Sequence, residues 1–168
     1  MRARSRSCAA MLAAVLYAVS GRAAPAQSTK DVAGFYTLVS IDNTRPDGSV
    51  VPQYGPHPKG ALSLDPSGRY ILFIRRADIE KFASSNVREG TAAENRSVVR
   101  GSIAHTGTYA IDGDGKTIVL RIESSTFPNQ DRTEMKRSLT LTPNELTYVV
   151  PVPSVGSGTA TLVWRRVK

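Results

Sequence analysis

Three side chains that can bind or react with a small molecule fall on predicted β-strands of this chain. His105 and Tyr109 lie in the segment 102–111, and Arg137 lies in the segment 132–142. Alternate residues of a strand share a face, and the other residues on these two faces are mostly apolar. We therefore expect His105, Tyr109 and Arg137 to point into an apolar interior. A titratable or cationic group there is costly unless it is paired, so all three are candidate ligand contacts.

Each candidate has a structural alternative that the sequence leaves open. His105 is either a hydrogen-bond donor or general base in a cavity, or a strand histidine whose hydrogen bonds are satisfied. The planar guanidinium of Arg137 either binds a carboxylate or phenolate of a ligand, or pairs with an acid such as Glu123. Arg75 has the same two interpretations. Tyr109 and Tyr148 either line a pocket or pack in the core.

The sequence predicts no catalytic set, metal site or cofactor. The second histidine, His57, lies in a proline-rich loop, and two histidines without a cluster do not make a metal site. The segment 112–115 (Asp-Gly-Asp-Gly) has the composition of a hairpin turn and lacks the further ligands of a calcium loop. Cys8 is the only cysteine, and it precedes the predicted mature chain, which excludes a cysteine nucleophile.

Apolar residues alternate with polar ones along most of the chain, which is typical of β-strands. In the first strand, Phe35, Thr37, Val39 and Ile41 are expected on one face, and Tyr36, Leu38 and Ser40 on the other. Short turns join most of the strands, which predicts an all-β, eight-stranded, up-and-down antiparallel barrel closed by pairing of the first strand with the last. Such an interior is filled by side chains or holds one small ligand. The expected strands are 34–42, 60–65, 69–75, 102–111, 116–124, 132–142, 145–150 and 159–167, with a brief extra strand at Val50-Val51.

A short helical insert separates the third and fourth of these strands. The segment 78–83 has apolar residues at helical spacing, and Thr91 followed by Glu94 has the spacing of a capping box. We expect one or two short helices between residues 77 and 100, which could cover a mouth of the barrel. Residues 27–30 are expected to form an irregular polar start.

Residues 1–26 have the features of a secretory signal peptide. Three arginines precede an apolar run at 8–20, and Ala24-Pro25-Ala26 fits a cleavage site. The run is shorter than the roughly 20 residues that span a bilayer, so the prediction is a secreted or periplasmic domain of residues 27–168 without a membrane span. The leader holds four of the 22 basic residues and no acid, which lowers the net charge from +8 to +4. This modest charge does not predict nucleic-acid binding.

Short motifs in this order resemble the bacterial lipocalin-like domain family. The segment 34–40 resembles the opening G-x-W-x-L-V-S of that family, with Tyr36 in place of tryptophan, and 162–166 resembles its closing L-x-W-x-R. The triplets 68–70 (Gly-Arg-Tyr), 107–109 (Gly-Thr-Tyr) and 127–129 (Phe-Pro-Asn) fall between them. The resemblance covers about residues 32–167 and implies the barrel fold, but it does not fix a function.

The expected function is therefore binding of a small hydrophobic ligand, which can carry an anionic group, inside the barrel. One alternative is a protein-interaction module with a filled core that uses its outer surface. The other is a barrel-type isomerase or cyclase with a hydrophobic substrate, in which His105 or Tyr109 transfers a proton and Arg137 stabilises negative charge. The sequence leaves the oligomeric state undefined.

Overall fold

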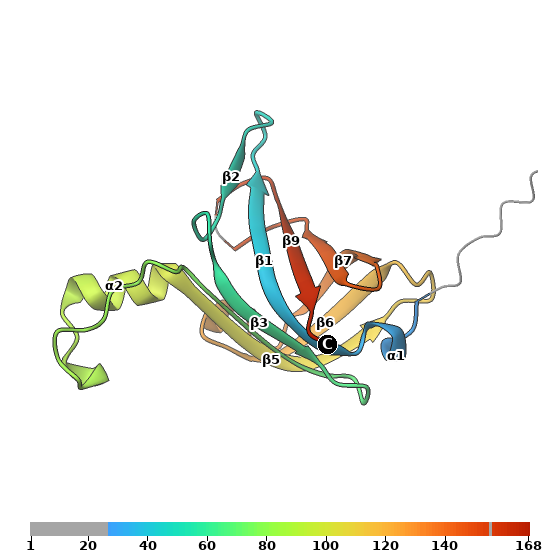
Figure 1. Cartoon of the computed structure of the whole chain (residues 1–168), viewed down its shortest axis with the longest axis horizontal. Helices are drawn as coiled ribbons and strands as arrows, with labels where there is room; N and C mark the ends of the chain where they lie inside the picture. The colour runs from blue at the N-terminus through green and yellow to red at the C-terminus, as the bar shows by residue number, and fades with distance from the viewer. Residues whose placement is uncertain (1–26, 155) are drawn as a thin grey trace, which may run out of the picture.

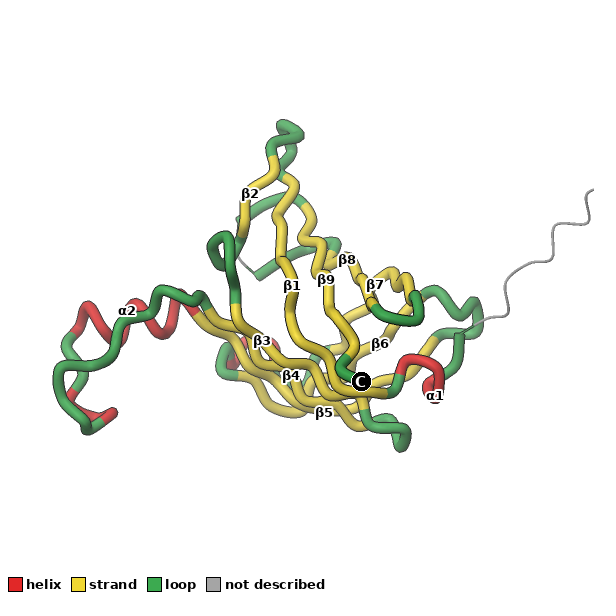
Figure 2. Tube along the Cα trace, viewed as in Figure 1, coloured by secondary structure: helices red, strands yellow, loops and turns green. Residues whose placement is uncertain are grey.

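The computed structural model describes residues 27–154 and 156–168, so the predicted leader at 1–26 lies outside the described residues. The described chain is a single antiparallel β-sheet with few helical residues (Figures 1 and 2). Its helical elements are α1 (Thr29–Val32), η1 (Val87–Glu89), α2 (Ala92–Gly101) and η2 (Pro128–Gln130). Its strands are β1 (Gly34–Thr44), β2 (Val50–Pro52), β3 (Lys59–Leu64), β4 (Arg69–Arg75), β5 (Ser102–Ile111), β6 (Thr117–Ser125), β7 (Glu134–Leu141), β8 (Glu145–Val150) and β9 (Thr159–Arg166).

The sheet closes into an eight-stranded barrel made of β1 and β3–β9. Each strand pairs with the next along the chain, and β1 also pairs with β9 from Tyr36↔Arg166 to Thr44↔Thr159. The three-residue β2 pairs with the last three residues of β1, and the hairpin that they form projects beyond the barrel (Figure 1). The predicted fold class, the closure and the brief extra strand are therefore confirmed.

A β-bulge in β1 changes which of its side chains face the interior. The register with β9 shifts between Leu38 and Ser40, so the alternation of faces is interrupted there. Phe35 and Val39 are exposed, whereas Ile41 is buried together with Tyr36. The expectation that Ile41 shares a face with Phe35 and Val39 is wrong, because a bulge adds one residue to the alternation and leaves no clear sequence signal.

The insert between β4 and β5 contains the α-helix α2 and the single 3₁₀ turn η1, in agreement with the expectation of one or two short helices between residues 77 and 100. Thr91 Oγ1 accepts a hydrogen bond from Glu94 N, and the Glu94 carboxylate accepts one from Thr91 N, as in the predicted capping box. The segment 78–83 is irregular instead of helical. Its Ile79 packs on Gly101, and its Ala83 N–H donates to Glu94 at 2.7 Å. Contacts with α2 therefore hold in place a segment that is too short to form a stable helix alone.

The insert projects away from the barrel. Figures 1 and 2 show α2 running outward from the start of β5, in an arm that continues β4 and β5 well clear of the barrel interior. This arm (residues 76–101) contributes no residue to the wall of the interior cavity described below. The expectation that the insert could cover a barrel mouth is not met. Ile79 and Phe82 pack on Gly101 and Gly90 within the arm, while Val87 and Val99 are exposed.

The other end of the barrel is closed by the start of the described chain. Residues 27–30 are predicted from the sequence to be irregular, but Thr29 and Lys30 form the first half of α1, where the capping Ser28 donates from its backbone and hydroxyl to the Asp31 carboxylate. Val32 is fully buried and accepts a hydrogen bond from the Tyr36 hydroxyl at 2.6 Å. The Arg166 guanidinium lies 5.0 Å from the Tyr36 ring centroid and donates to the carbonyls of Asp31 and Ala33. These contacts tie both ends of the barrel domain together.

We predict that Tyr36→Phe lowers the free energy of unfolding by about 1–3 kcal/mol, because the buried Val32 carbonyl loses its donor. Urea denaturation measures this change. Tyr148→Phe is a matched control, since it removes an equally buried hydroxyl that has no hydrogen-bond partner in the described structure. Equal losses of stability in the two variants would contradict this role of Tyr36.

Candidate functional site

The barrel contains a cavity of about 270 Å³ at the end opposite α1. Its wall is mostly apolar, and it comes from strands on all sides of the barrel. The buried apolar wall residues are Ile41, Leu72, Ile74, Ala160 and Leu162, joined by the less buried Ile103, Met135 and Val150. The volume lies near the lower end of the roughly 300–1,000 Å³ that ligand pockets occupy, so the cavity suits a small organic molecule.

Loops form the rim through which the cavity reaches the surface. Phe127 at the start of η2 is 41% exposed, and Val152 after β8 is 84% exposed, yet both line the cavity. Gln53 and Tyr54, which follow β2, line it from the opposite side. The mouth therefore offers apolar side chains that are partly in water, while the deeper wall is dry.

His105 lies on the cavity wall in a fixed orientation. Its Nδ1 is 2.9 Å from the Tyr70 hydroxyl of the neighbouring strand, and the two rings meet edge to face. In the tautomer in which the Tyr70 hydroxyl donates to Nδ1, the proton of the neutral imidazole is on Nε2, where it can be donated to another group.

Arg137 is a buried cation on the same wall. It is 6% exposed, and its guanidinium carbon lies 5.0 Å from the centroid of the Tyr148 ring. One Nη2 proton is donated to Met135 Sδ at 3.3 Å, a weak acceptor. Its Nε is enclosed without a hydrogen-bond partner, and none of the ion pairs among the described residues involves Arg137. The alternative pairing of Arg137 with Glu123 is not formed, because Glu123 lies on the outer surface bound to Arg69.

Tyr148 and Trp164 place two further polar groups in the core next to Arg137. Both are almost completely buried, with ring centroids 6.3 Å apart. The Tyr148 hydroxyl and Trp164 Nε1 are enclosed, and neither makes a hydrogen bond of good geometry in the described structure. Together with Arg137 Nε they form a cluster of three enclosed polar groups (the Arg137–Tyr148–Trp164 cluster), of which Arg137 and Tyr148 line the cavity and Trp164 does not.

The electrostatics keep the other groups near Arg137 neutral. Burial lowers the pKa of His105 to about 3, and the Arg137 charge contributes to this shift. Burial also raises the pKa of the Tyr70 and Tyr148 phenols, although the nearby Arg137 charge opposes the increase. Arginine itself stays protonated in proteins. The inner wall of the cavity therefore carries one positive charge over a wide range of pH.

The structure brings together three of the five residues predicted to contact a ligand. His105, Arg137 and Tyr148 line the cavity. Tyr109 is at the closed end instead, where its hydroxyl donates to the Asp65 carbonyl at 2.8 Å. Arg75 lies on the outward side of β4, since the alternate residues Tyr70, Leu72 and Ile74 point inward. Neither Tyr109 nor Arg75 is part of the cavity wall.

Sequence reasoning missed Tyr70 and most of the rim. Tyr70 fixes the His105 ring, but recognising this requires the register of β4 against β5 across a 26-residue insert, which aligns Leu72 with His105. The rim residues Gln53, Phe127 and Val152 lie in connections without strand periodicity. The Phe-Pro-Asn triplet at 127–129 was the one available signal for the rim, and it carried no information about a cavity.

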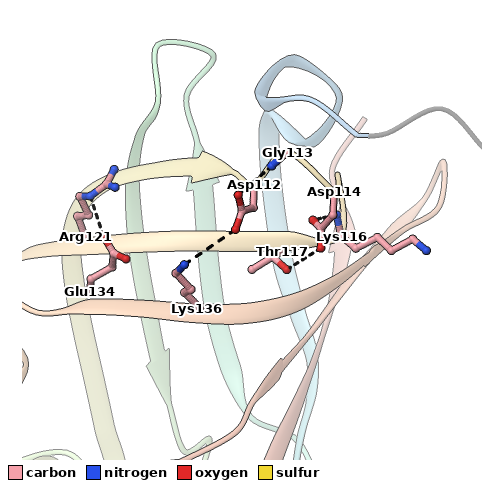
Figure 3. A network of polar contacts seen from close by, with 8 residues as sticks. All are labelled: Asp112, Gly113, Asp114, Lys116, Thr117, Arg121, Glu134 and Lys136. Atoms are coloured by element: carbon pink, nitrogen blue, oxygen red, sulfur yellow. Dashed lines mark hydrogen bonds and ion pairs between the residues drawn. The ribbon is translucent and has the colours of Figure 1, made fainter.

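The acidic turn between β5 and β6 lies on the outside of the barrel, and its carboxylates are used locally. Asp112 accepts from Gly113 N and lies 4.0 Å from Lys136 Nζ, and Asp114 accepts from Lys116 N and the Thr117 hydroxyl (Figure 3). Through these contacts the two aspartates stabilise the turn. Among the described residues, no three His, Cys, Asp or Glu side chains gather as metal ligands.

A closed antiparallel barrel with an interior cavity and a loop-lined mouth defines a class of small-ligand-binding folds. A family model described as a lipocalin-like domain matches residues 33–167. The chain belongs to the lipocalin-like domain family, so the resemblance of its motifs is confirmed. Neither the curated proteins nor the solved structures compared with the chain give a match. In the described part of the chain, no helix has the length and apolar character needed to cross a membrane.

We predict that His105 makes the protein less stable in mild acid. The imidazole has an ordinary pKa near 6.5 when unfolded and a pKa of about 3 when folded. The unfolded chain therefore binds more protons between these values. The stabilisation is complete above about pH 6.5 and falls with pH by up to about 1.4 kcal/mol per pH unit.

Urea denaturation between about pH 6.5 and pH 5, above most carboxylate titrations, measures this slope. His105→Gln should flatten it, whereas His57→Gln, at an exposed loop position, should retain it. An unchanged slope in His105→Gln would show that the folded protein protonates His105 as easily as the unfolded chain does.

Proposed function

We propose that this protein is a secreted or periplasmic binding protein that holds one small, mostly apolar molecule with an anionic group inside its barrel. The observation that carries the proposal is the guanidinium of Arg137, which is buried on the wall of a 270 Å³ cavity and has no carboxylate partner in the described structure. The apolar wall around it accounts for the hydrophobic part of the ligand.

The cost of burying Arg137 supports the anionic group. An isolated cation in an apolar interior loses its hydration, and only an opposite charge or good hydrogen bonds compensate for this loss. Met135 Sδ and the Tyr148 ring supply a weak acceptor and a cation–π contact. An anion bound in the cavity would supply the missing counter-charge.

The proposed location is supported by the sequence of residues 1–26 and by the absence of cysteine from residues 27–168. A chain without thiols is unaffected by an oxidising compartment, and its fold depends on the hydrophobic core alone. The buried apolar residues of β1 and β3–β9 form one such continuous core.

Two alternatives have weaker support. An interaction module would use exposed apolar residues such as Ile71 and Phe73 on β4, but a cavity inside the barrel is unnecessary for that function. A barrel-type isomerase or cyclase would need an acid–base group near Arg137. Tyr109 lies at the other end of the barrel, and the low pKa of His105 makes it a weak base.

We predict that blocking the cavity abolishes ligand binding. Ala160 is buried on the cavity wall, so Ala160→Phe places a ring in the ligand volume, and Ala160→Val is a milder variant if the first does not fold. Ala61→Phe on the outer face of β3 is the matched control, next to the exposed Phe73.

The measurement is the melting temperature with saturating medium-chain or aromatic acids and alcohols as probes. A ligand at a hundredfold excess over its Kd adds about 2.7 kcal/mol of stability. The wild type and Ala61→Phe should show the resulting increase in Tm, and Ala160→Phe should not. If Ala160→Phe retains the increase, binding occurs outside the barrel and the proposal is wrong.

A further inference from the structure

We infer that the ligand is a monocarboxylate that enters carboxylate first, so that its anionic group lies against Arg137 and Tyr148 and its apolar part extends toward Phe127 and Val152. The inference rests on the proposed function, since it concerns the same cavity. It adds the chemical class of the anion, its position and the orientation of the ligand.

The Arg137–Tyr148–Trp164 cluster has unused donors. Arg137 Nε, the Tyr148 hydroxyl and Trp164 Nε1 are all enclosed, and none makes a hydrogen bond of good geometry within the described residues. Arg137 and Trp164 do lie close enough to the Tyr148 hydroxyl to oppose the increase of its pKa. Buried polar groups in folded proteins nearly always have partners, and a group left without one costs about 1–3 kcal/mol. Three such groups on adjacent side chains indicate a site that is completed by another molecule.

Every polar group at the inner end of the cavity can donate a hydrogen bond. Of the groups that line it, Arg137 has only donors, the Tyr148 hydroxyl has one proton to give, and His105 presents its Nε2–H in the tautomer whose Nδ1 accepts from Tyr70. A ligand group bound there must therefore accept hydrogen bonds. A deprotonated acid does so on each of its oxygens, whereas an alcohol, an amide or an ammonium brings protons of its own.

Charge balance selects a single negative charge. Among the described residues that line the cavity, Arg137 alone is charged, and His105, Tyr70 and Tyr148 are neutral at ordinary pH. A dianion such as a phosphate monoester would leave one negative charge buried without compensation. Among monoanions, a carboxylate fits best, because its planar pair of oxygens matches the guanidinium and it leaves most of the small cavity for an apolar group.

The position of Arg137 sets the orientation. The polar cluster lies at the inner end, beside the fully buried Trp164, while Phe127 and Val152 lie at the rim, partly in water. A carboxylate at the mouth would leave the cluster unsatisfied and place an apolar tail against three donors. With the carboxylate inside, the tail contacts the apolar wall and covers the exposed rim side chains.

The test uses the fluorescence of Trp164, the only tryptophan in the chain. Purified protein is titrated with hexanoate, decanoate and phenylacetate and with the alcohols of the same carbon skeletons. Each acid should bind about tenfold or more tightly than its alcohol, because it accepts charged hydrogen bonds that the alcohol cannot. Hexanoate brominated at the α carbon should quench Trp164 more than hexanoate brominated at the ω carbon.

Three variants separate the contributions of the side chains. Arg137→Gln should remove the preference for acids over alcohols, while Arg121→Gln, which removes an exposed strand arginine bound to Glu134, should keep it (Figure 3). Tyr148→Phe should weaken acid binding several-fold without lowering stability, because it deletes an unpaired hydroxyl. Substitution of a purely structural residue would lower the stability as well, so this pair of effects would identify Tyr148 as a ligand contact.

The outcomes distinguish the inference from the proposed function. Equal affinity for acids and alcohols, or stronger quenching by the ω-brominated acid, would overturn the carboxylate-first inference while leaving the cavity as a binding site. No binding by any of the six probes would overturn both. If Arg137→Gln does not fold, the wild-type comparison of acids with alcohols and the Tyr148→Phe variant still decide between these outcomes.

Discussion

Pairing between β1 and β9 is the interaction on which the interior of this barrel depends. Without it the sheet would have two open edges, and its inner face would be in contact with water. The eleven residues of β1 make this closure possible, since its first part pairs with β3, its last part with β2, and nearly all of it with β9. Closure creates the dry environment in which a single buried charge has a large energetic effect.

Each end of the barrel has an arginine next to a tyrosine ring, but the two guanidinium groups differ in their hydrogen bonds. Arg166 and Arg137 each lie 5.0 Å from the centroid of a tyrosine ring. At the closed end, Arg166 also donates to two backbone carbonyls, so its role in holding α1 is complete without a ligand. At the cavity, Arg137 has only Met135 Sδ as an acceptor in the described structure. The difference in hydrogen-bond satisfaction, rather than residue type or ring contact, separates a structural arginine from a candidate binding arginine.

The fold was predictable because strand periodicity and short turns are local signals. The alternation in β5 and β7 was sufficient to place His105 and Arg137 inside, and the capping box marked the start of α2. The bulge at Leu38 and the irregular segment 78–83 were not predictable, because register and arm packing decide them. The site was only partly predictable for the same reason. Tyr109 and Arg137 occupy inward positions of similar appearance in the sequence, but the depth of a residue along the barrel axis depends on strand stagger, which alternation does not encode.

The projecting arm of residues 76–101 makes the stability of this protein uneven along its chain. The hydrogen bonds between side chains and backbone in the arm, such as those of Glu94 to Ala83 and Thr91, are local, and the arm joins the barrel at the Arg75↔Ser102 pair. Opening the arm therefore exposes little of the core and requires much less free energy than opening the closed sheet. Amide hydrogens of α2 will exchange by such local opening, while those of β1 and β9 will exchange only by global unfolding. A peptide bond cleaved within the arm would leave two fragments still held together by the intact ladder of barrel strands.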